Sequence, residues 1–488
     1  MSSPVISDRR WWALGVLSIT QLMVALDATV INIALPHAQD DLHFSLANRQ
    51  WVITAYALSF GSLLLVGGRL SDMWGRRTSL YVGLAGFAVA SAVGGSAHSF
   101  STLVAARAVQ GVFGAVLAPA ALAALSTTFG NPTERAKAFS IYGAIGASGA
   151  AIGLLLGGAL TQWATWRWCL FINLFFAAIA IVGVTLFVAG GKREDKANLD
   201  VLGTLLGSGG LFFVVYGFAH AVNTGWGNWI TWGSLVIGVV LLVTFVKWQQ
   251  RSKNPLLPLR LLINRVRGGS LVALFLTSIG IFGISLFLAY YLQGTLGYSP
   301  LRTGVAFLPL VGAIALSATI ASARLLAVSG PRPLIPTGML LCMMGMVLFT
   351  RLTPNADYFS NVMPGLVVTG LGLGLIFAPA IASATAGVRL NDVGAASALV
   401  NTTQQIGGSV GLALLNTIAV SVTARASAAS YYLDGIPKLR NAAVLATLHG
   451  YAVAFWWAAG FFGVGAVLTF GLLESGVTEY DGDVAPAT

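Results

Sequence analysis

The sequence predicts an all-α, polytopic membrane protein with fourteen transmembrane helices. Three observations predict this class: 56% of the 488 residues are hydrophobic, only 9% are charged, and apolar stretches long enough to cross a membrane recur along the chain. Soluble proteins carry about 25% charged residues, and a folded soluble protein of this size could not cover its surface with so few. Disordered, collagen-like and coiled-coil proteins need polar or repetitive compositions, so this composition excludes them as well.

Fourteen apolar stretches reach the roughly 20 residues that a helix needs to cross a hydrocarbon core about 30 Å thick. Short linkers containing Gly, Pro and Asn separate them, as is typical of turns. The first stretch follows Arg9 and Arg10, but it is too long for a signal peptide and lacks a small-residue cleavage site, so we expect a retained helix. The predicted helices cover residues 12–36, 51–71, 78–98, 101–128, 136–161, 168–190, 201–222, 229–248, 268–294, 301–323, 333–351, 359–387, 393–422 and 449–473.

The distribution of basic residues predicts the orientation of these helices. If both termini are cytoplasmic, 19 of the 27 Lys and Arg residues lie in inside segments, seven lie in outside segments, and Arg107 lies within a span. Multispanning proteins carry such an excess of Lys and Arg on the cytoplasmic side. The net charge of +11 therefore reflects membrane topology and attraction to the inner leaflet, and we expect no nucleic-acid partner.

Three sequence patterns recur in one register in the second part of the chain. Two related six-helix halves with substrate held between them are typical of transporters. We therefore predict an N-terminal half over 1–192, two inserted helices with a basic linker over 193–266, a C-terminal half over 267–475, and a short acidic cytoplasmic tail over 476–488. The repeated patterns are Gly114–Ala120 with Gly374–Ala380, the set Arg69, Leu70, Gly75 and Arg77 with Arg324, Leu325, Gly330 and Arg332, and Gly149 and Gly153 with Gly407 and Gly411.

Asp27 and Arg107 are the charged residues that lie well inside the predicted spans, at similar depth in the outer half of the membrane. A charge at the centre of a span costs about 2.5–3.5 kcal/mol or more, so each needs an explanation. One alternative is structural: the two residues pair, or Arg107 extends its long side chain to the membrane surface. The other is functional. Burial disfavours a charged carboxylate, so Asp27 can carry a proton at physiological pH, and a nearby Arg107 favours its release.

Two glycine-containing motifs predict close contacts. The first ends the second predicted helix, where glycines permit close approach and a tight turn, and where the aspartate can cap the next helix or pair with a basic residue. Its residues are Gly68, Asp72, Gly75, Arg76 and Arg77. The second lies in the fifth predicted helix, where a face of small residues lets another helix approach closely; ordinary membrane-helix packing is the alternative explanation. Its residues are Gly149, Gly153 and Gly157, with Gly158 beyond them.

Polar and aromatic residues within the spans are candidates for the wall of a substrate cavity, and for each aromatic a lipid-facing or packing role is an equal alternative. The candidates are Asn32, Tyr56, Tyr142, Tyr290, Tyr291, Gln293, Asn401, Gln404 and Gln405. The five histidines are scattered, and Cys169 and Cys342 both lie in apolar stretches. We therefore expect no metal site, no cofactor and no enzymatic active site.

Five motifs of the sequence resemble those of one known family. They are Leu26–Pro36, Gly68–Arg77, Arg107–Gly111, Gly149–Gly158 and Trp166–Asn173. Together they resemble the major facilitator superfamily, specifically its fourteen-helix drug:proton antiporter branch, and the resemblance covers almost the whole chain. In that family the second motif acts as a conformational latch, the arginine of the third is implicated in proton coupling, and the fourth is the antiporter motif.

Three positions differ from the family pattern. Leu154 follows Gly153 where a proline is usual, Leu174 follows Asn173 where the branch commonly has another proline, and Ala327 stands in the second-half loop where an aspartate would stand. Losing the prolines predicts straighter helices. Ala327 predicts an asymmetric cytoplasmic latch that Asp72 alone carries.

The resemblance implies a bacterial plasma-membrane antiporter that functions as a monomer, is driven by the proton gradient and needs no cofactor. Asp27 would gain and release a proton as the two halves rock, and substrate would leave as the proton enters. Without a second deeply buried acid, neutral or singly cationic amphiphiles fit better than dications. The alternatives are a proton-coupled uptake symporter on the same scaffold and an intramembrane enzyme, for which the sequence shows no clustered nucleophile, base or metal ligands.

Overall fold

The computed structural model describes residues 5–44, 46–189, 200–252, 255–321, 325–388, 392–433 and 439–473, and these ranges contain helices and no strand. The first helices are α1 (Val5–Leu42), α2 (Leu46–Trp74), α3 (Arg76–Gly95), α4 (Phe100–Thr128), α5 (Pro132–Trp163) and α6 (Trp168–Phe187). Next come α7 (Val201–Thr224), α8 (Trp229–Gln249) and the short α9 (Arg260–Ile263). The remainder comprises α10 (Arg265–Gly283), η1 (Ile284–Leu288), η2 (Tyr291–Thr295), α11 (Pro300–Ala306), α12 (Leu308–Ile320), α13 (Leu326–Ser329), α14 (Pro331–Phe349), η4 (Tyr358–Val362), α15 (Met363–Thr385), α16 (Val393–Leu433) and α17 (Leu439–Leu472).

The predicted all-α membrane architecture is confirmed. Thirteen helical segments of the described chain are long and apolar enough to cross a membrane. Each coincides with a predicted stretch, and the remaining predicted stretch, 136–161, coincides with α5, a helix of 32 residues. Consecutive predicted stretches therefore form separate helices, as their punctuation by Gly, Pro and Asn indicates.

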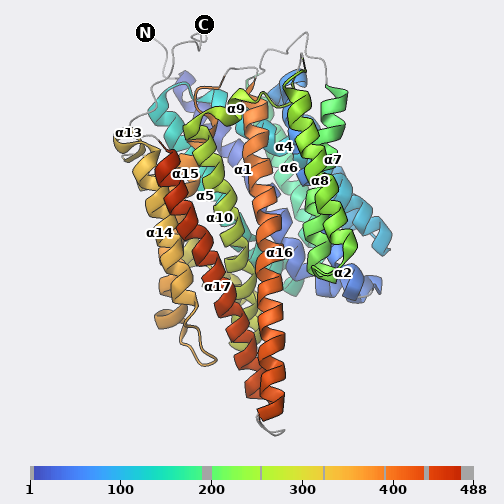
Figure 1. The fold of residues 1–488 in the computed structure, drawn as a ribbon. Coiled ribbons are helices and arrows are strands. Elements are labelled where there is room, and N and C mark those ends of the chain that lie inside the picture. Colours follow the sequence, from blue (N-terminus) through green and yellow to red (C-terminus); the bar gives the residue numbers. More distant parts are fainter. Residues whose placement is uncertain are drawn as a thin grey trace.

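Two helices are longer than hydropathy predicts. α16 continues to Leu433 and α17 begins at Leu439, where the sequence pattern predicts 393–422 and 449–473. Figure 1 shows the resulting pair projecting below the rest of the bundle. A window of apolar residues detects only the part of a helix that lies in hydrocarbon, whereas alanine-rich segments such as 423–430 also favour helix outside it.

The internal repeat is visible in the backbone. Gly75 and Gly330, which the repeat pairs, both precede a helix and both have positive φ, 84° and 70°. Only glycine adopts such values without strain, so the two loops use the same turn. The fifth helix of each half also packs on the first through glycine: a Cβ at Gly149 would lie 2.4 Å from the Cβ of Ala25, and one at Gly411 would lie 2.5 Å from the Ile279 carbonyl oxygen.

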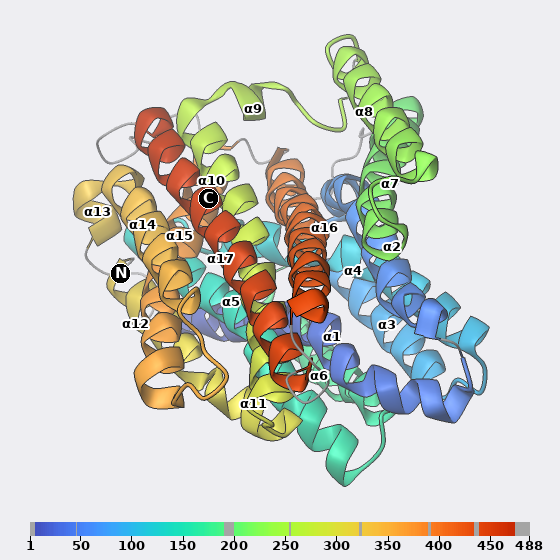
Figure 2. The ribbon, with the colours of Figure 1, turned by 60° about the horizontal axis from the view of Figure 1, so that its bottom comes forward.

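The two halves meet along two related seams. α2 lies against α16 on one side, and α5 lies against α12 and α11 on the other. α7 packs against α8 and contacts both α2 and α16, so the inserted pair covers the first seam, as Figure 2 shows. Trp226, after α7, donates from Nε1 to Thr417 Oγ1 of α16 at 2.9 Å. Of the two inserted helices, α7 thus contacts both halves, and α8 packs on α7.

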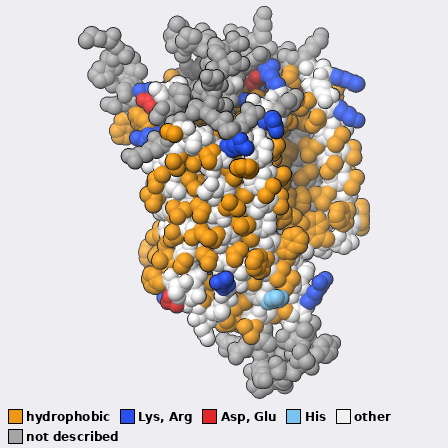
Figure 3. All heavy atoms as spheres, turned by 60° about the vertical axis from the view of Figure 1, so that its left-hand side comes forward, with side chains coloured by type: hydrophobic (Ala, Val, Ile, Leu, Met, Phe, Trp, Pro, Cys, Tyr) orange, Lys and Arg blue, Asp and Glu red, His pale blue; other side chains and the backbone are white. Residues whose placement is uncertain are grey.

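α1 begins and α17 ends at the same end of the bundle, which we call the basic end. Lys137 of α5 lies 5.0 Å over the ring of Trp11 near the start of α1, and a Cβ on Gly269 of α10 would lie 3.0 Å from the side chain of Leu473, which follows α17. Figure 3 shows Lys and Arg side chains gathered toward this end, with hydrophobic side chains covering the middle of the face. A broad apolar belt bounded by charges is the surface that a bilayer requires.

Candidate functional site

A buried ion pair joins α1 to α4 inside the N-terminal half. Arg107 Nη1 lies 2.6 Å from Asp27 Oδ2, and the side chains of both residues are 1% exposed. Arg107 also donates from Nε to the Val52 carbonyl oxygen of α2 at 3.3 Å. The guanidinium is therefore held between α1 and α2 on donors that point in different directions, which a planar Arg side chain permits.

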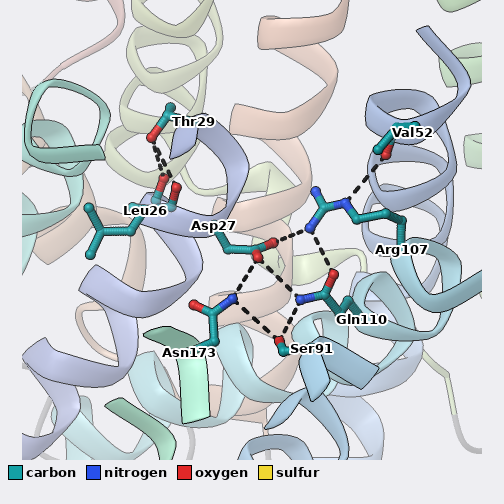
Figure 4. A network of polar contacts seen from close by, with 9 residues as sticks. Leu26, Asp27, Thr29, Val52, Ser91, Arg107, Gln110 and Asn173 are labelled. Atoms are coloured by element: carbon teal, nitrogen blue, oxygen red, sulfur yellow. Dashed lines mark hydrogen bonds and ion pairs between the residues drawn. The ribbon is translucent and has the colours of Figure 1, made fainter. Parts of the chain in front are cut away.

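Three neutral residues complete the network around Asp27, as Figure 4 shows. Gln110 Nε2 and Asn173 Nδ2 both donate to Asp27 Oδ1, at 3.2 and 2.8 Å. The same two amide groups donate to Ser91 Oγ, at 2.6 and 3.3 Å. Gln110 Oε1 accepts from Arg107 Nη1 at 2.8 Å. The site thus draws one polar side chain from α3, one from α6 and two from α4 to a single carboxylate on α1.

The prediction that Asp27 and Arg107 lie at similar depth agrees with this pairing, whereas extension of Arg107 to the membrane surface is wrong. An unpaired buried charge is far costlier than a paired one, so the arginine stays beside the carboxylate. Sequence reasoning missed the roles of Ser91, Gln110 and Asn173. Gln110 and Asn173 lie within the motifs quoted above, but a neutral amide in an apolar helix carries no charge that would single it out.

Tyr56, one of the cavity candidates, belongs to this site. Its ring lies 4.4 Å from Arg107 Cζ, on the face that attracts cations, and its side chain is 6% exposed. Phe60 stacks on it at 5.5 Å, one helical turn further along α2. Tyr56 therefore contacts the Asp27–Arg107 pair through the guanidinium of Arg107.

The glycine face of α5 sets the position of α1. A Cβ at Gly153 would lie 1.9 Å from Thr29 Oγ1, and one at Gly157 would lie 3.0 Å from the Val30 carbonyl oxygen. With the contact of Gly149 on Ala25, these positions bracket Asp27 along α1. Gly158 is buried in the same helix. The predicted close helix approach is thus observed, and its partner is the helix that carries Asp27.

The predicted latch residues lie at the basic end, where α2 meets α16. Asp72 Oδ1 accepts from the Gly394 backbone N–H at 3.2 Å, in the first turn of α16. A carboxylate at a helix N-terminus is favoured by the helix dipole. A Cβ at Gly68 would lie 2.6 Å from both the Ala398 side chain and the Gly394 carbonyl oxygen, so only glycine allows this contact between the halves.

The other members of the latch motif have different positions. Gly75 makes the turn into α3, and Arg76 opens that helix. Arg77 donates from Nη2 to the Thr185 carbonyl oxygen of α6 at 2.9 Å and from Nε to Tyr81 at 3.3 Å. The described contacts of Arg77 are therefore within the N-terminal half, whereas those of Gly68 and Asp72 cross to the C-terminal half.

A second contact between the halves, which sequence reasoning missed, lies at the C-terminus of α15. Arg135 of α5 donates from Nη2 to the Thr385 carbonyl oxygen at 2.8 Å. Arg267 of α10 donates to the neighbouring carbonyl oxygens of Ala384 and Ala386, at 3.1 and 3.0 Å. Cations favour the negative, C-terminal end of a helix dipole. Two residues of the N-terminal half therefore contact the ends of the α15–α16 connection: Arg135 at the end of α15 and Asp72 at the start of α16.

Replacing Asp72 with Asn is expected to slow transport while leaving membrane insertion intact. The amide oxygen can still accept from Gly394, but the charge that favours the α16 N-terminus, worth about 0.3–1 kcal/mol, is lost. Initial transport rates per embedded protein measure the effect. Asp200→Asn is the matched control, because Asp200 accepts from Gly203 N at the start of α7 without joining the halves. Unchanged transport by Asp72→Asn would remove the latch hypothesis.

The other cavity candidates are dispersed. The Tyr142 hydroxyl donates to Gln21 Oε1 at 2.8 Å, Asn401 donates to its own helix, and Gln405 lies over Gly61 of α2. Gln404 is half-buried and Gln293 is exposed. Tyr290 is 53% exposed and Tyr291 is fully buried, while the side chain of Asn32 lies outside the described residues. Their contact with substrate remains a prediction.

Two further observations concern ligand sites. A groove of about 790 Å³ lies between α3 and α4; its lining includes Val89 and Phe113 but none of the cavity candidates. Among the described residues no group of three or more His, Cys, Asp or Glu side chains could hold a metal ion. Cys169 and Cys342 are free and buried.

A membrane-embedded bundle of two related halves, with a buried acid–base pair in one of them, is typical of transporters that expose their binding site alternately to the two sides of the membrane. The chain matches the Major Facilitator Superfamily over residues 17–412 and belongs to that family. It is similar in fold to the proton:xylose symporter XylE, with a TM-score of 0.65, 13% identity, and coverage of 96% of this chain and 97% of that one.

Characterised relatives place the chain in the drug-efflux branch. It is 48% identical over 469 residues to the puromycin resistance protein pur8 of Streptomyces alboniger, covering 96% of this chain and 92% of that protein. It is 35% identical to the cephamycin export protein CmcT of Amycolatopsis lactamdurans, covering 84% and 86%. It is 32% identical to the multidrug efflux pump LfrA of Mycolicibacterium smegmatis, covering 84% and 81%.

Proposed function

We propose that this protein exports amphiphilic antibiotics or related small molecules across the cell membrane in exchange for protons. The observation that carries the proposal is the fully buried Asp27–Arg107 pair on a transporter scaffold. A carboxylate so far from water is costly, and such residues mark proton and substrate pathways in membrane proteins. The export and resistance roles named for the relatives support the direction of transport.

The cycle follows from the charges of the site. When Asp27 is ionised, it and Arg107 neutralise each other. When a proton binds Asp27, Arg107 loses its counter-charge, and the site favours a different arrangement of α1 and α4. Because α1 is held against α5, and α5 lies on the seam between the halves, this rearrangement reaches the contacts between the halves. Proton binding from outside and substrate binding from the cytoplasm would thus favour opposite states of the transporter.

The buried carboxylates indicate how much positive charge a substrate can carry. Among the described residues, the buried carboxylates are Asp27, Asp72 and Asp392. Asp72 occupies the last turn of α2 at the basic end, and Asp392 precedes α16 at the same end. Asp27 is therefore the single described carboxylate deep in a span, and no second described carboxylate there can compensate a dication. Neutral or singly cationic amphiphiles fit, and puromycin, which the name of the 48% identical relative gives, is the first compound to test.

The orientation and assembly are parts of the same proposal. The basic end would face the cytoplasm, as the excess of Lys and Arg favours, so that both termini and the Asp72 latch lie there. The site is built from α1, α2, α3, α4 and α6 of one chain, which supports function as a monomer.

Substrate-triggered proton movement in inverted vesicles tests the proposal. With an imposed inside-acid gradient, adding puromycin to the bath should dissipate the gradient, because the cytoplasmic face is outside and each substrate that enters releases a proton to the bath. Vesicles without the protein are the control. A puromycin-dependent increase of the gradient, or substrate uptake with no proton movement across a panel of amphiphiles, would contradict antiport.

A further inference from the structure

Asn173 contains the unused acceptor of the Asp27 network. Its side chain is 1% exposed, and its Nδ2 donates both to Asp27 Oδ1 and to Ser91 Oγ. Its other amide atom, Oδ1, is fully buried and accepts from no group of the described protein. A buried acceptor without a partner costs about 1–3 kcal/mol, so this arrangement stabilises only one protonation state of Asp27.

In the described arrangement every hydrogen bond at Asp27 is donated to it. Arg107 donates to Oδ2, and Gln110 and Asn173 donate to Oδ1. This set suits an ionised carboxylate, which only accepts. A protonated carboxyl group has one O–H donor and needs an acceptor at that position, and N–H groups cannot provide it.

Asn173 is the neighbour that can change from donor to acceptor. Gln110 Oε1 is held by Arg107 Nη1 at 2.8 Å, so turning that amide would set an NH₂ group against a guanidinium. Ser91 Oγ already accepts from both amides. A half-turn of the Asn173 amide exchanges Nδ2 for Oδ1 at almost the same place, because the two ends of an amide are nearly equal in size.

We propose that Asn173 accommodates the proton on Asp27 by this half-turn, an inference that rests on the proposed function. A proton from the external water forms an O–H bond at Asp27 Oδ1, and no other covalent bond changes. The new hydroxyl donates to Asn173 Oδ1. The Ser91 hydroxyl, relieved of one donor, can rotate and donate to the same amide oxygen. Asn173 is thus a positioning residue that fits both protonation states.

The other groups that face Asp27 do not provide this exchange. Arg107 of α4 is the charged one, and Tyr56 of α2 is held face-on against the guanidinium. Cys169 of α6 lies nearby, with its Sγ 3.9 Å from the Gly157 carbonyl oxygen. α5 contacts this part of α1 through Gly149, Gly153 and Gly157, which carry no ionisable side chain, and α3 supplies Ser91. No second carboxylate among the described buried groups shares the proton.

The proposal predicts the sign of a change in pH dependence. In Asn173→Leu the ionised Asp27 loses one of its three donors and keeps Arg107 and Gln110. The protonated form loses its one acceptor, so its buried O–H is left with no partner, and this is the larger loss. Hydrogen bonds to the neutral form favour that form, so their loss favours the ionised one. Proton exchange driven by puromycin should become half-maximal at a pH about one unit lower. This pH is that of the vesicle lumen, which corresponds to the outside of the cell. If Asn173 only donates to Asp27 and never turns, the midpoint should instead move higher, because losing a donor to the ionised form favours the protonated form.

The experiment compares the full-length protein in vesicles with Asn173→Leu and with Gln110→Leu as the matched variant. Gln110→Leu removes a donor that cannot turn, so its midpoint should move higher while that of Asn173→Leu moves lower. Asn173→Val repeats the test if the leucine variant does not fold. A higher or unchanged midpoint for both Asn173 variants would overturn the inference. Failure of Asp27→Asn to abolish exchange would instead overturn the proposed function.

Discussion

Replacing Asp27 with Asn is expected to abolish substrate-driven proton exchange, leaving the rate of vesicles without the protein. The amide has nearly the shape of the carboxyl group but cannot gain or lose a proton at neutral pH. Asp27 is 2% exposed, and among the described buried residues no other carboxylate is deep in a span. Measuring puromycin-driven dissipation of the pH gradient at equal protein content checks the prediction. Exchange that survives the substitution would remove Asp27 from the mechanism.

The same substitution leaves the Arg107 cation buried without its counter-charge. Removing one partner of a buried pair costs about 3–5 kcal/mol, so the single variant should also unfold at a lower temperature. The double variant Asp27→Asn, Arg107→Gln removes both charges and separates the two effects. We expect it to regain thermal stability without regaining exchange. If instability alone caused the loss of transport, the double variant would transport again.

Replacing Gly149 with Ala is expected to reduce transport about 100-fold. The added Cβ would lie 2.4 Å from the Cβ of Ala25 and 3.5 Å from its Cα, and alanine has no rotamer through which it could move aside. α1 and α5 must therefore separate, and Asp27 is two residues from the contact. Misplacing a reacting group by about 1 Å from a remote position can cost about 10²-fold.

Gly143 provides the matched control in the same helix. An alanine Cβ there would lie 3.7 Å from the nearest heavy atom, the Ala378 nitrogen, which is an ordinary contact. Transport rates, thermal unfolding temperatures and the pH profile of both alanine variants should be compared. We expect Gly143→Ala to match the parent protein. Equal effects of the two substitutions would show that the distance between α1 and α5 does not set the activity.

The helices were predictable because their cause is local. Crossing hydrocarbon needs a continuous run of apolar residues, and turn residues interrupt each run. The repeat was predictable for a similar reason: Gly75 and Gly330 are needed wherever the backbone takes positive φ. The extension of α16 to Leu433 was not predictable from hydropathy, because helix outside the membrane does not depend on apolar side chains.

Part of the site was predictable and part was not. Asp27 and Arg107 were conspicuous because a charge within a span is costly wherever it points. Ser91 and Asn173 carry no charge and resemble many polar residues that bond to their own helix, as Asn401 does. Which polar residues converge depends on helix rotation and crossing, and these arise from packing across the whole bundle.

The amino-acid sequence alone indicates that this chain spans a membrane, that its second part repeats patterns of its first, and that one acid and one base lie within spans of the first part. Composition, periodicity and the cost of buried charge suffice for each of these. The packed helices were needed to show that Asp27 and Arg107 touch, that two amides and a serine surround them, and that Asp72 and Arg135 contact the other half. Hydrogen bonds act over about 3 Å, and such distances between remote segments exist only once the helices have packed.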